Sequence, residues 1–126
     1  RTIPGSRFYI HAADVADAMQ FLLELDDSKL EADYGDAKCP KFNLVGKQEI
    51  NNLQLAQIIA DAQGKELKYE MMDFHSARPG HDLRYALDGD YMRKLGWEPK
   101  VELTERIGEV VDWTLQNDRW LRCEDE

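Results

Sequence analysis

This sequence of 126 residues has little cysteine and no long apolar run, and the two absences exclude several protein classes. Its two cysteines, Cys39 and Cys123, lie far apart and form no C-x-x-C pair, so we expect reduced thiols in a cytoplasmic protein. No apolar run is long enough to span a bilayer, and no charged leader followed by an apolar core opens the chain. We therefore expect a soluble globular protein. Its first residue is Arg rather than Met, which is typical of a processed or excised piece.

Basic residues are also scarce relative to acidic ones. The chain has 16 Lys and Arg against 25 Asp and Glu, which gives a formal net charge of -9. Such a protein has no general affinity for nucleic acid or for anionic membranes, because both repel it. A bound phosphate would therefore need a local cluster of basic side chains. The acidic tail, residues 121–126, is expected to be a frayed and solvated end.

The sequence also lacks a Gly-rich turn of the Gly-x-Gly-x-x-Gly type. Dinucleotides bind a Rossmann fold at such a turn, because glycine lets the pyrophosphate approach a helix N-terminus. A Tyr and a Lys four residues apart can act together when a helix puts them on one face. One such spacing is present, from Tyr34 to Lys38, but it lies in a loop rich in Gly and Asp. Without a helix, the two side chains have no reason to share a face. We expect this chain alone to bind no dinucleotide and to hold no catalytic residue.

Hydrophobic periodicity predicts an α/β fold in a single domain, 1–126. Helices are expected at 14–25, 52–63, 89–95 and 104–116, with Asn51 or Asn52, Asp88 and Thr104 as caps. Extended segments are expected at 7–11, 42–45, 67–72 and 84–87, and a long polar loop at 26–40. The order strand, helix, strand from 42 to 72 predicts a βαβ unit with parallel pairing, and hence a small, mostly parallel sheet with about four helices. Three tryptophans are expected to pack the last helix against the rest, namely Trp97, Trp113 and Trp120.

A short stretch, Arg78-Pro79-Gly80-His81, is typical of a type II turn, with Pro second and Gly third. Such a turn brings its first and fourth residues side by side, so Arg78 and His81 would offer a guanidinium fork and an imidazole to one anion. A solvated surface turn is the alternative. A metal site is not expected, because the spacing of His75, His81 and Asp82 matches no zinc or iron arrangement.

Several motifs together resemble one enzyme family. The stretch Arg78-Pro-Gly-His-Asp-Leu-Arg-Tyr-Ala-Leu-Asp88, followed by Lys94-Leu-Gly-Trp-Glu-Pro99 and Val111-Asp-Trp113, is similar to the C-terminal part of the nucleotide-sugar 4,6-dehydratases. These enzymes are extended short-chain dehydrogenases/reductases of the NAD-dependent epimerase/dehydratase family. Upstream segments resemble the same family in the same order: Arg7-Phe-Tyr-Ile-His-Ala-Ala-Asp14, Phe42-Asn-Leu-Val-Gly46 and Glu49-Ile-Asn-Asn52. The likeness covers nearly the whole chain and is closest to enzymes of dTDP-hexoses.

The resemblance implies that the chain binds a nucleotide-diphosphate sugar. By its position in the motifs, Arg7 would reach the diphosphate, Arg78 would supply a second fork, His81 would help to bind the nucleotide, and Asn52 would contact the substrate. Two converging guanidinium forks suit a diphosphate, because they neutralise its charges while giving directional hydrogen bonds.

The residues alone leave alternatives open for two of these side chains. Arg7 could instead form an ion pair with Asp14 or Asp17. Asn52 could instead cap the helix that it begins, although Asn51 is able to take that role.

The resemblance also implies what the parent enzyme would need. NAD would be held by a Rossmann half that this chain lacks, and that half would supply the catalytic residues. A 4-epimerase is an alternative parent. A further alternative is a free-standing truncated module that acts in assembly or partner binding, without catalysis. Such a module would form a homo-oligomer through the apolar faces of the first helix and of segment 42–45.

Overall fold

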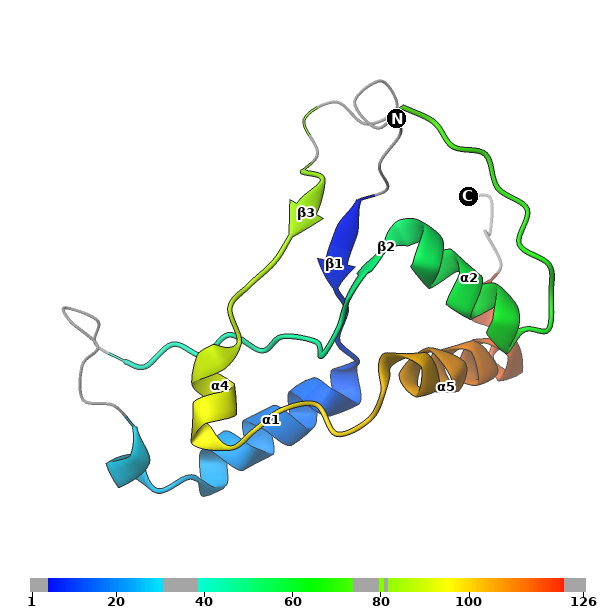
Figure 1. The fold of residues 1–126 in the computed structure, drawn as a ribbon. Coiled ribbons are helices and arrows are strands. Elements are labelled where there is room, and N and C mark those ends of the chain that lie inside the picture. Colours follow the sequence, from blue (N-terminus) through cyan, green and yellow to red (C-terminus); the bar gives the residue numbers. More distant parts are fainter. Residues whose placement is uncertain (1–4, 31–38, 74–79, 81, 122–126) are drawn as a thin grey trace.

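The computed structural model describes residues 5–30, 39–73, 80 and 82–121 (Figure 1). This part of the chain has an α/β fold, as the sequence predicts. Its helices are α1 (Ala12–Glu24), α2 (Asn52–Ala62), α4 (Asp90–Leu95) and α5 (Leu103–Gln116). Its strands are β1 (Ser6–Phe8), β2 (Glu49–Asn51) and β3 (Arg84–Tyr85), and two 3-10 turns follow α1 and α5, η1 (Asp27–Lys29) and η2 (Asp118–Trp120). No helix in these ranges is long and apolar enough to cross a membrane.

The three strands form one sheet in the order β2-β1-β3. The central strand β1 pairs antiparallel with β2 and parallel with β3, so the sheet is mixed rather than mostly parallel. Arg7 lies opposite Ile50 in β2 and Tyr85 in β3, which puts these three side chains on one face. Ser6 lies opposite Arg84 on the other face.

The predicted βαβ unit is wrong. Neither segment 42–45 nor segment 67–72 is a strand, whereas Glu49–Asn51, just before the expected helix 52–63, forms β2. The alternation of apolar and polar residues predicts an extended backbone with one buried side. It does not predict whether that segment pairs with another strand, or with which one. The segment after α2 shows this, because it runs extended but apart from the three strands (Figure 1), with Tyr69, Met71 and Met72 exposed.

Local side-chain bonds fix the starts of the first two long helices. The N-cap of α1 is His11, whose Nδ1 accepts a hydrogen bond from the backbone N–H of Ala13 at 3.1 Å, so the helix begins before the expected Asp14. The N-cap of α2 is Asn51. It forms a capping box with Gln54, in which each side chain accepts from the backbone N–H of the other at 2.8 Å.

Two other predicted caps need correction. The N-cap of α4 is Gly89, although Asp88 still contributes, because its side chain accepts from the backbone N–H of Asp90 at 2.8 Å. The N-cap of α5 is Glu102, with no side-chain bond, and Thr104 lies inside the helix. The expected polar loop begins with η1, whereas residues 31–38 and 122–126 lie outside the described part, as does the Tyr34 to Lys38 spacing.

The best-buried core lies between α1 and α4. Ala18, Met92 and Trp97 are almost fully buried there. Partly buried side chains pack around them, namely Ile10, Phe21, Leu22, Phe42, Leu44 and Leu95. The predicted packing role is thus confirmed for Trp97, although the cluster that Trp97 joins contains no residue of the last helix. It is wrong for Trp113 and Trp120, which are 53% and 64% exposed and contact each other with ring centroids 6.4 Å apart.

A close backbone contact explains the glycine that ends the Phe42–Gly46 motif. A Cβ atom at Gly46 would lie 1.9 Å from the carbonyl oxygen of Tyr9, so only glycine lets the two backbones meet. We expect Gly46→Ala to lower the free energy of unfolding by roughly 1–3 kcal/mol or more, because backbone must move to admit the methyl group. Urea unfolding measures this change.

The matched control is Gly108→Ala in α5, where an added Cβ meets no atom within 4 Å. That variant should be as stable as the parent, or slightly more stable, because alanine favours a helix. Equal stability of Gly46→Ala and the parent would show that the contact is not needed.

Candidate functional site

The guanidinium of Arg7 is held by backbone oxygens and an aromatic ring. Its Nη1 donates to the carbonyl oxygens of Ser6 at 2.6 Å and Leu83 at 3.3 Å, and its Nη2 donates to that of Asp82 at 3.3 Å. The ring of Tyr85 lies under it, with Cζ 4.2 Å from the centroid. These contacts orient the guanidinium but leave its charge unpaired, since no carboxylate of the described ranges forms an ion pair with it.

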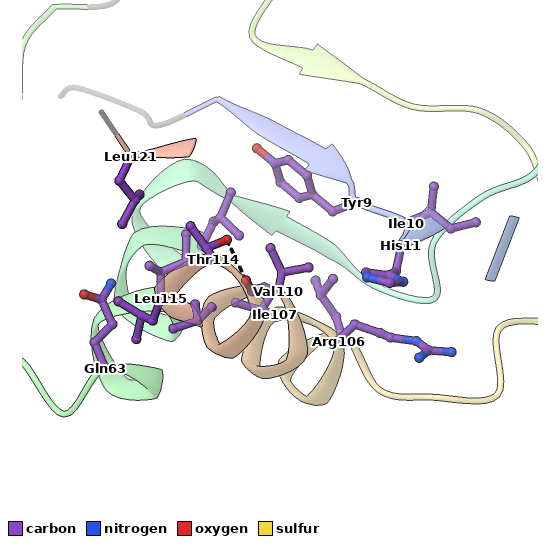
Figure 2. Close-up of a pocket in the computed structure, with 14 residues that line it drawn as sticks. Tyr9, Ile10, His11, Gln63, Arg106, Ile107, Val110, Thr114, Leu115 and Leu121 are labelled. Atoms are coloured by element: carbon purple, nitrogen blue, oxygen red, sulfur yellow. Dashed lines mark hydrogen bonds between the residues drawn. The ribbon is translucent and has the colours of Figure 1, made fainter. Parts of the chain in front are cut away.

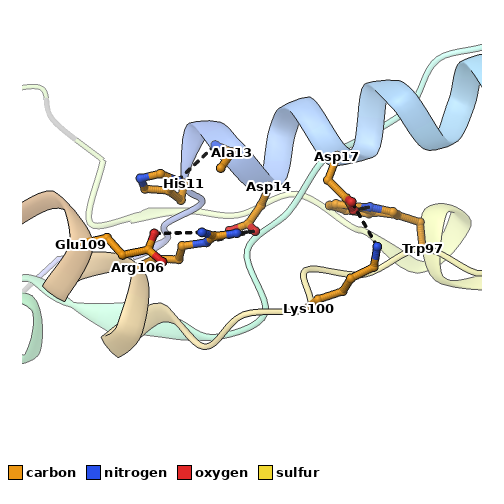
Figure 3. A network of polar contacts seen from close by, with 8 residues as sticks. All are labelled: His11, Ala13, Asp14, Asp17, Trp97, Lys100, Arg106 and Glu109. Carbon is orange, nitrogen blue, oxygen red and sulfur yellow. Dashed lines mark hydrogen bonds and ion pairs between the residues drawn. The ribbon is translucent and has the colours of Figure 1, made fainter.

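The alternative ion pair of Arg7 with Asp14 or Asp17 is wrong, because both carboxylates have other partners (Figure 3). Asp14 is buried against Arg106, whose Nη2 donates to Oδ1 at 2.7 Å. Asp17 accepts from the indole N–H of Trp97 at 2.8 Å. The sequence pattern did not reveal the Asp14 and Arg106 pair, because its members come from helices far apart in the chain.

These contacts shift pKa values in the directions that favour the charged forms. The indole N–H of Trp97 and then the ammonium of Lys100 lower the pKa of Asp17 below its ordinary value. The carboxylate of Asp14 and then that of Glu109 raise the pKa of Arg106. Both networks tie α1 to the C-terminal part of the chain and keep its acidic side chains away from Arg7.

Asn52 is the first residue of α2, and its side chain is not used as the cap, because Asn51 takes that role. Its backbone N–H donates to the carbonyl oxygen of Gly5 at 2.9 Å. Its side-chain Oδ1 accepts from the hydroxyl of Tyr9 at 3.1 Å. The side-chain Nδ2 has no hydrogen-bond partner among the residues that the structure describes.

The structure brings Arg7 and Asn52 together beside Gly5. A Cβ atom built on Gly5 would lie 3.6 Å from Nη1 of Arg7 and 3.6 Å from Nδ2 of Asn52. A cationic donor from β1 and an amide donor from α2 are therefore neighbours. Such a pair is suited to an oxyanion, because both groups donate hydrogen bonds and one carries positive charge.

The other two predicted site residues, Arg78 and His81, lie outside the described residues. Gly80, between them, has φ of 79°, which is the value that the third position of a type II turn requires. The two residues after His81 are Asp82 and Leu83, whose carbonyl oxygens accept hydrogen bonds from Arg7. The chain that follows the predicted turn therefore lies against Arg7.

The opposite face of the sheet carries a network that sequence reasoning missed. Glu49 in β2 accepts from Arg84 in β3 through both oxygens, at 2.6 and 2.9 Å, and from the hydroxyl of Ser6 in β1 at 2.7 Å. The hydrogen bonds from Arg84 and then from Ser6 lower the pKa of Glu49 from 4.5 to about 2. The network joins all three strands. The available sequence signal was the alternation of side chains along each strand, which puts every second residue on the same face.

We expect acid to weaken the sheet through Glu49. Because the folded-state pKa is below the unfolded value, this contribution to stability is present above pH 4.5 and is lost as the pH falls toward about 2. Glu49→Gln should therefore have a melting temperature that falls less than that of the parent between about pH 5 and pH 2. The control is Glu66→Gln, at an exposed position after α2, and its pH profile should match that of the parent. Parallel profiles for all three proteins would contradict this role.

An apolar cavity of about 440 Å³ lies between α2, α5 and the residues that follow β1 (Figure 2). Its walls are mainly aliphatic and include Leu55, Ile59, Ile107, Val110, Leu115 and Leu121. Tyr9 and His11 border it, whereas Arg7 and Asn52 do not. Val110 and Leu115 line this open cavity, and they are 45% and 54% exposed.

No family model matches this chain. It is 36% identical to the dTDP-glucose 4,6-dehydratase of Shigella flexneri over 86 residues, which are 64% of this chain and 24% of that protein. It is 31% identical to the dTDP-glucose 4,6-dehydratase of Streptomyces niveus over 115 residues, or 90% of this chain and 31% of that protein. Its homologues are dTDP-glucose 4,6-dehydratases.

The fold agrees with this relation. A crystal structure of dTDP-glucose 4,6-dehydratase from Bacillus anthracis in complex with NAD superposes with a TM-score of 0.66, at 24% identity. The match covers 93% of this chain and 33% of the dehydratase. The chain thus spans about a quarter to a third of the length of the dehydratases that it resembles.

Proposed function

We propose that this chain is the C-terminal, substrate-binding portion of a nucleotide-sugar 4,6-dehydratase and that it binds the diphosphate of its substrate. The observation that carries the proposal is the unpaired charge of Arg7. In a chain with a net charge of -9, this guanidinium is oriented by three carbonyl oxygens and a tyrosine ring, but no described carboxylate neutralises it. An anionic ligand would supply the missing partner.

The other arginines in the described ranges support this interpretation by contrast. Arg84, Arg93 and Arg106 each form an ion pair with a carboxylate. Arg119 stacks on its neighbour Trp120, with Cζ 5.0 Å from the ring centroid. Arg7 is the one in this set that lies in the sheet beside an amide donor without a partner.

Two further side chains complete the proposed site. Arg78 would supply a second fork to the diphosphate, and His81 would help to bind the nucleotide. Their place in the chain supports these roles. The carbonyl oxygens of Asp82 and Leu83, which directly follow His81, accept hydrogen bonds from Arg7. Arg7, Asn52, Arg78 and His81 would together give the affinity that places the sugar for reaction in the complete enzyme.

NAD fits the complete enzyme, since the similar Bacillus anthracis dehydratase is an NAD complex. The residues of this chain do not fit an NAD site, because no Gly-rich turn joins a strand to a helix. We therefore assign neither NAD binding nor catalysis to this chain. The names of its homologues favour a dTDP-hexose as the substrate and a dehydratase over an epimerase as the parent.

Calorimetry on the isolated chain tests the proposal. We expect dTDP-glucose to bind, dTDP to retain most of the affinity, and thymidine, which has no phosphate, to give no heat. UDP- and GDP-sugars would measure the preference for the base. No heat with any nucleotide sugar at millimolar concentration, for a chain that is folded by circular dichroism, would contradict the proposal.

An assembly role is the second candidate, and exposed apolar side chains favour it. On α1, Met19 is 58% and Leu23 is 87% exposed. They lie on the first helix, one of the two elements for which an uncovered apolar face was predicted, whereas Phe42, Leu44 and Val45 of the other are half-buried or buried. An exposed apolar face is commonly buried in self-association. Light scattering would support this candidate if the chain forms a stable dimer that Leu23→Glu dissociates, while nucleotide sugars give no heat.

A further inference from the structure

We infer that Tyr9 is a positioning residue, whose hydroxyl orients the side-chain amide of Asn52 toward the ligand of Arg7. The inference rests on the proposed function and extends it to a residue that does not itself touch the ligand. The two asparagines at the start of α2 have separate roles. Asn51 caps the helix, so the neighbouring side chain of Asn52 is available for another contact.

The hydrogen bond from Tyr9 decides which end of the amide is available. The hydroxyl donates to Oδ1 of Asn52 at 3.1 Å, so the nitrogen, with its two N–H groups, is left for a ligand. That nitrogen lies on the side of Gly5 where Nη1 of Arg7 also lies. Without the hydroxyl, the amide could turn about its last torsion, which is broad and two-fold, and present its oxygen instead. An oxygen facing an anion is repulsive.

Tyr9 has the rigid support that such a role needs. Its backbone carbonyl lies against Gly46, where a Cβ would come within 1.9 Å. Tyr9 is half-buried and its ring borders the apolar cavity, so packing restricts the ring and with it the position of the hydroxyl (Figure 2). Tyr9 follows β1 directly, two residues after Arg7, so one segment carries the cationic donor and the group that orients the amide donor.

The test is a double-mutant cycle on dTDP binding, measured by calorimetry. Tyr9→Phe keeps the ring and removes only the hydroxyl, and we expect it to raise the dissociation constant about 2- to 10-fold. Asn52→Ala should raise it by at least as much. In the Asn52→Ala background, Tyr9→Phe should have no further effect, because the group that it orients is gone. The control is Tyr69→Phe, at an exposed tyrosine after α2, which should bind as the parent does.

A second measurement needs no ligand. In a proton–nitrogen NMR spectrum, the side-chain amide signal of Asn52 should shift in Tyr9→Phe and not in Tyr69→Phe. An unshifted signal, or additive effects in the binding cycle, would overturn the role of Tyr9 while leaving the proposed function standing. Absence of dTDP binding in the parent chain would overturn the proposed function and the ligand role of Tyr9 together, even if the amide signal shifts.

Discussion

Asp14→Ala should lower the melting temperature of this protein by roughly 10 °C or more. The carboxylate that it removes is 7% exposed and neutralises Arg106, whose side chain is 17% exposed. Nε and Nη2 of Arg106 both donate to Asp14, and only Nη1 turns to Glu109. The variant would leave the guanidinium of Arg106 with little access to water and with Glu109 as its remaining ion-pair partner.

An exposed ion pair provides the control for this prediction. Lys100 pairs with Asp17 at 3.0 Å but is 74% exposed, so Lys100→Ala should change the melting temperature little. The double variant Asp14→Leu with Arg106→Met should recover much of the loss, because it replaces both charges by apolar groups. Equal melting temperatures for Asp14→Ala and Lys100→Ala would contradict a structural role for the buried pair.

Arg7→Ala should raise the dissociation constant for dTDP or dTDP-glucose by about 10- to 100-fold, because charge-assisted hydrogen bonds contribute more than neutral ones. Arg7→Lys should fall between the parent and Arg7→Ala, since it keeps the charge but not the planar fork. Calorimetry measures both constants. The melting temperature of each variant separates a loss of binding from a loss of folding.

Arg119→Ala is the matched control for this prediction. Arg119 also stacks on an aromatic ring and also has no carboxylate partner among the described ion pairs, but it lies in η2 after α5. It should bind dTDP as the parent does. Equal weakening by Arg7→Ala and Arg119→Ala would mean that the ligand responds only to the overall charge of the protein.

The candidate site was predictable in part. The motifs singled out Arg7 and Asn52, and the structure places the donors of both side chains beside Gly5. The contribution of Tyr9 was not predictable. A tyrosine in a short strand-like segment is typical of packing, and nothing in the spacing from Tyr9 to Asn52 indicates that a hydroxyl meets an amide. That contact depends on how the residues after β1 lie against the start of α2.

The sequence by itself determined several local features of this protein. The cap at Asn51, the glycine turn at Gly80 and the helical periodicities depend on residues a few positions apart, which stay close in any fold. Tertiary structure alone decided the pairing of the strands and of the charges. Arg7 is close to Asp14 in sequence, but Asp14 pairs with Arg106 of α5. Packing of α5 against the start of α1 brings these two residues together, although they are far apart along the chain.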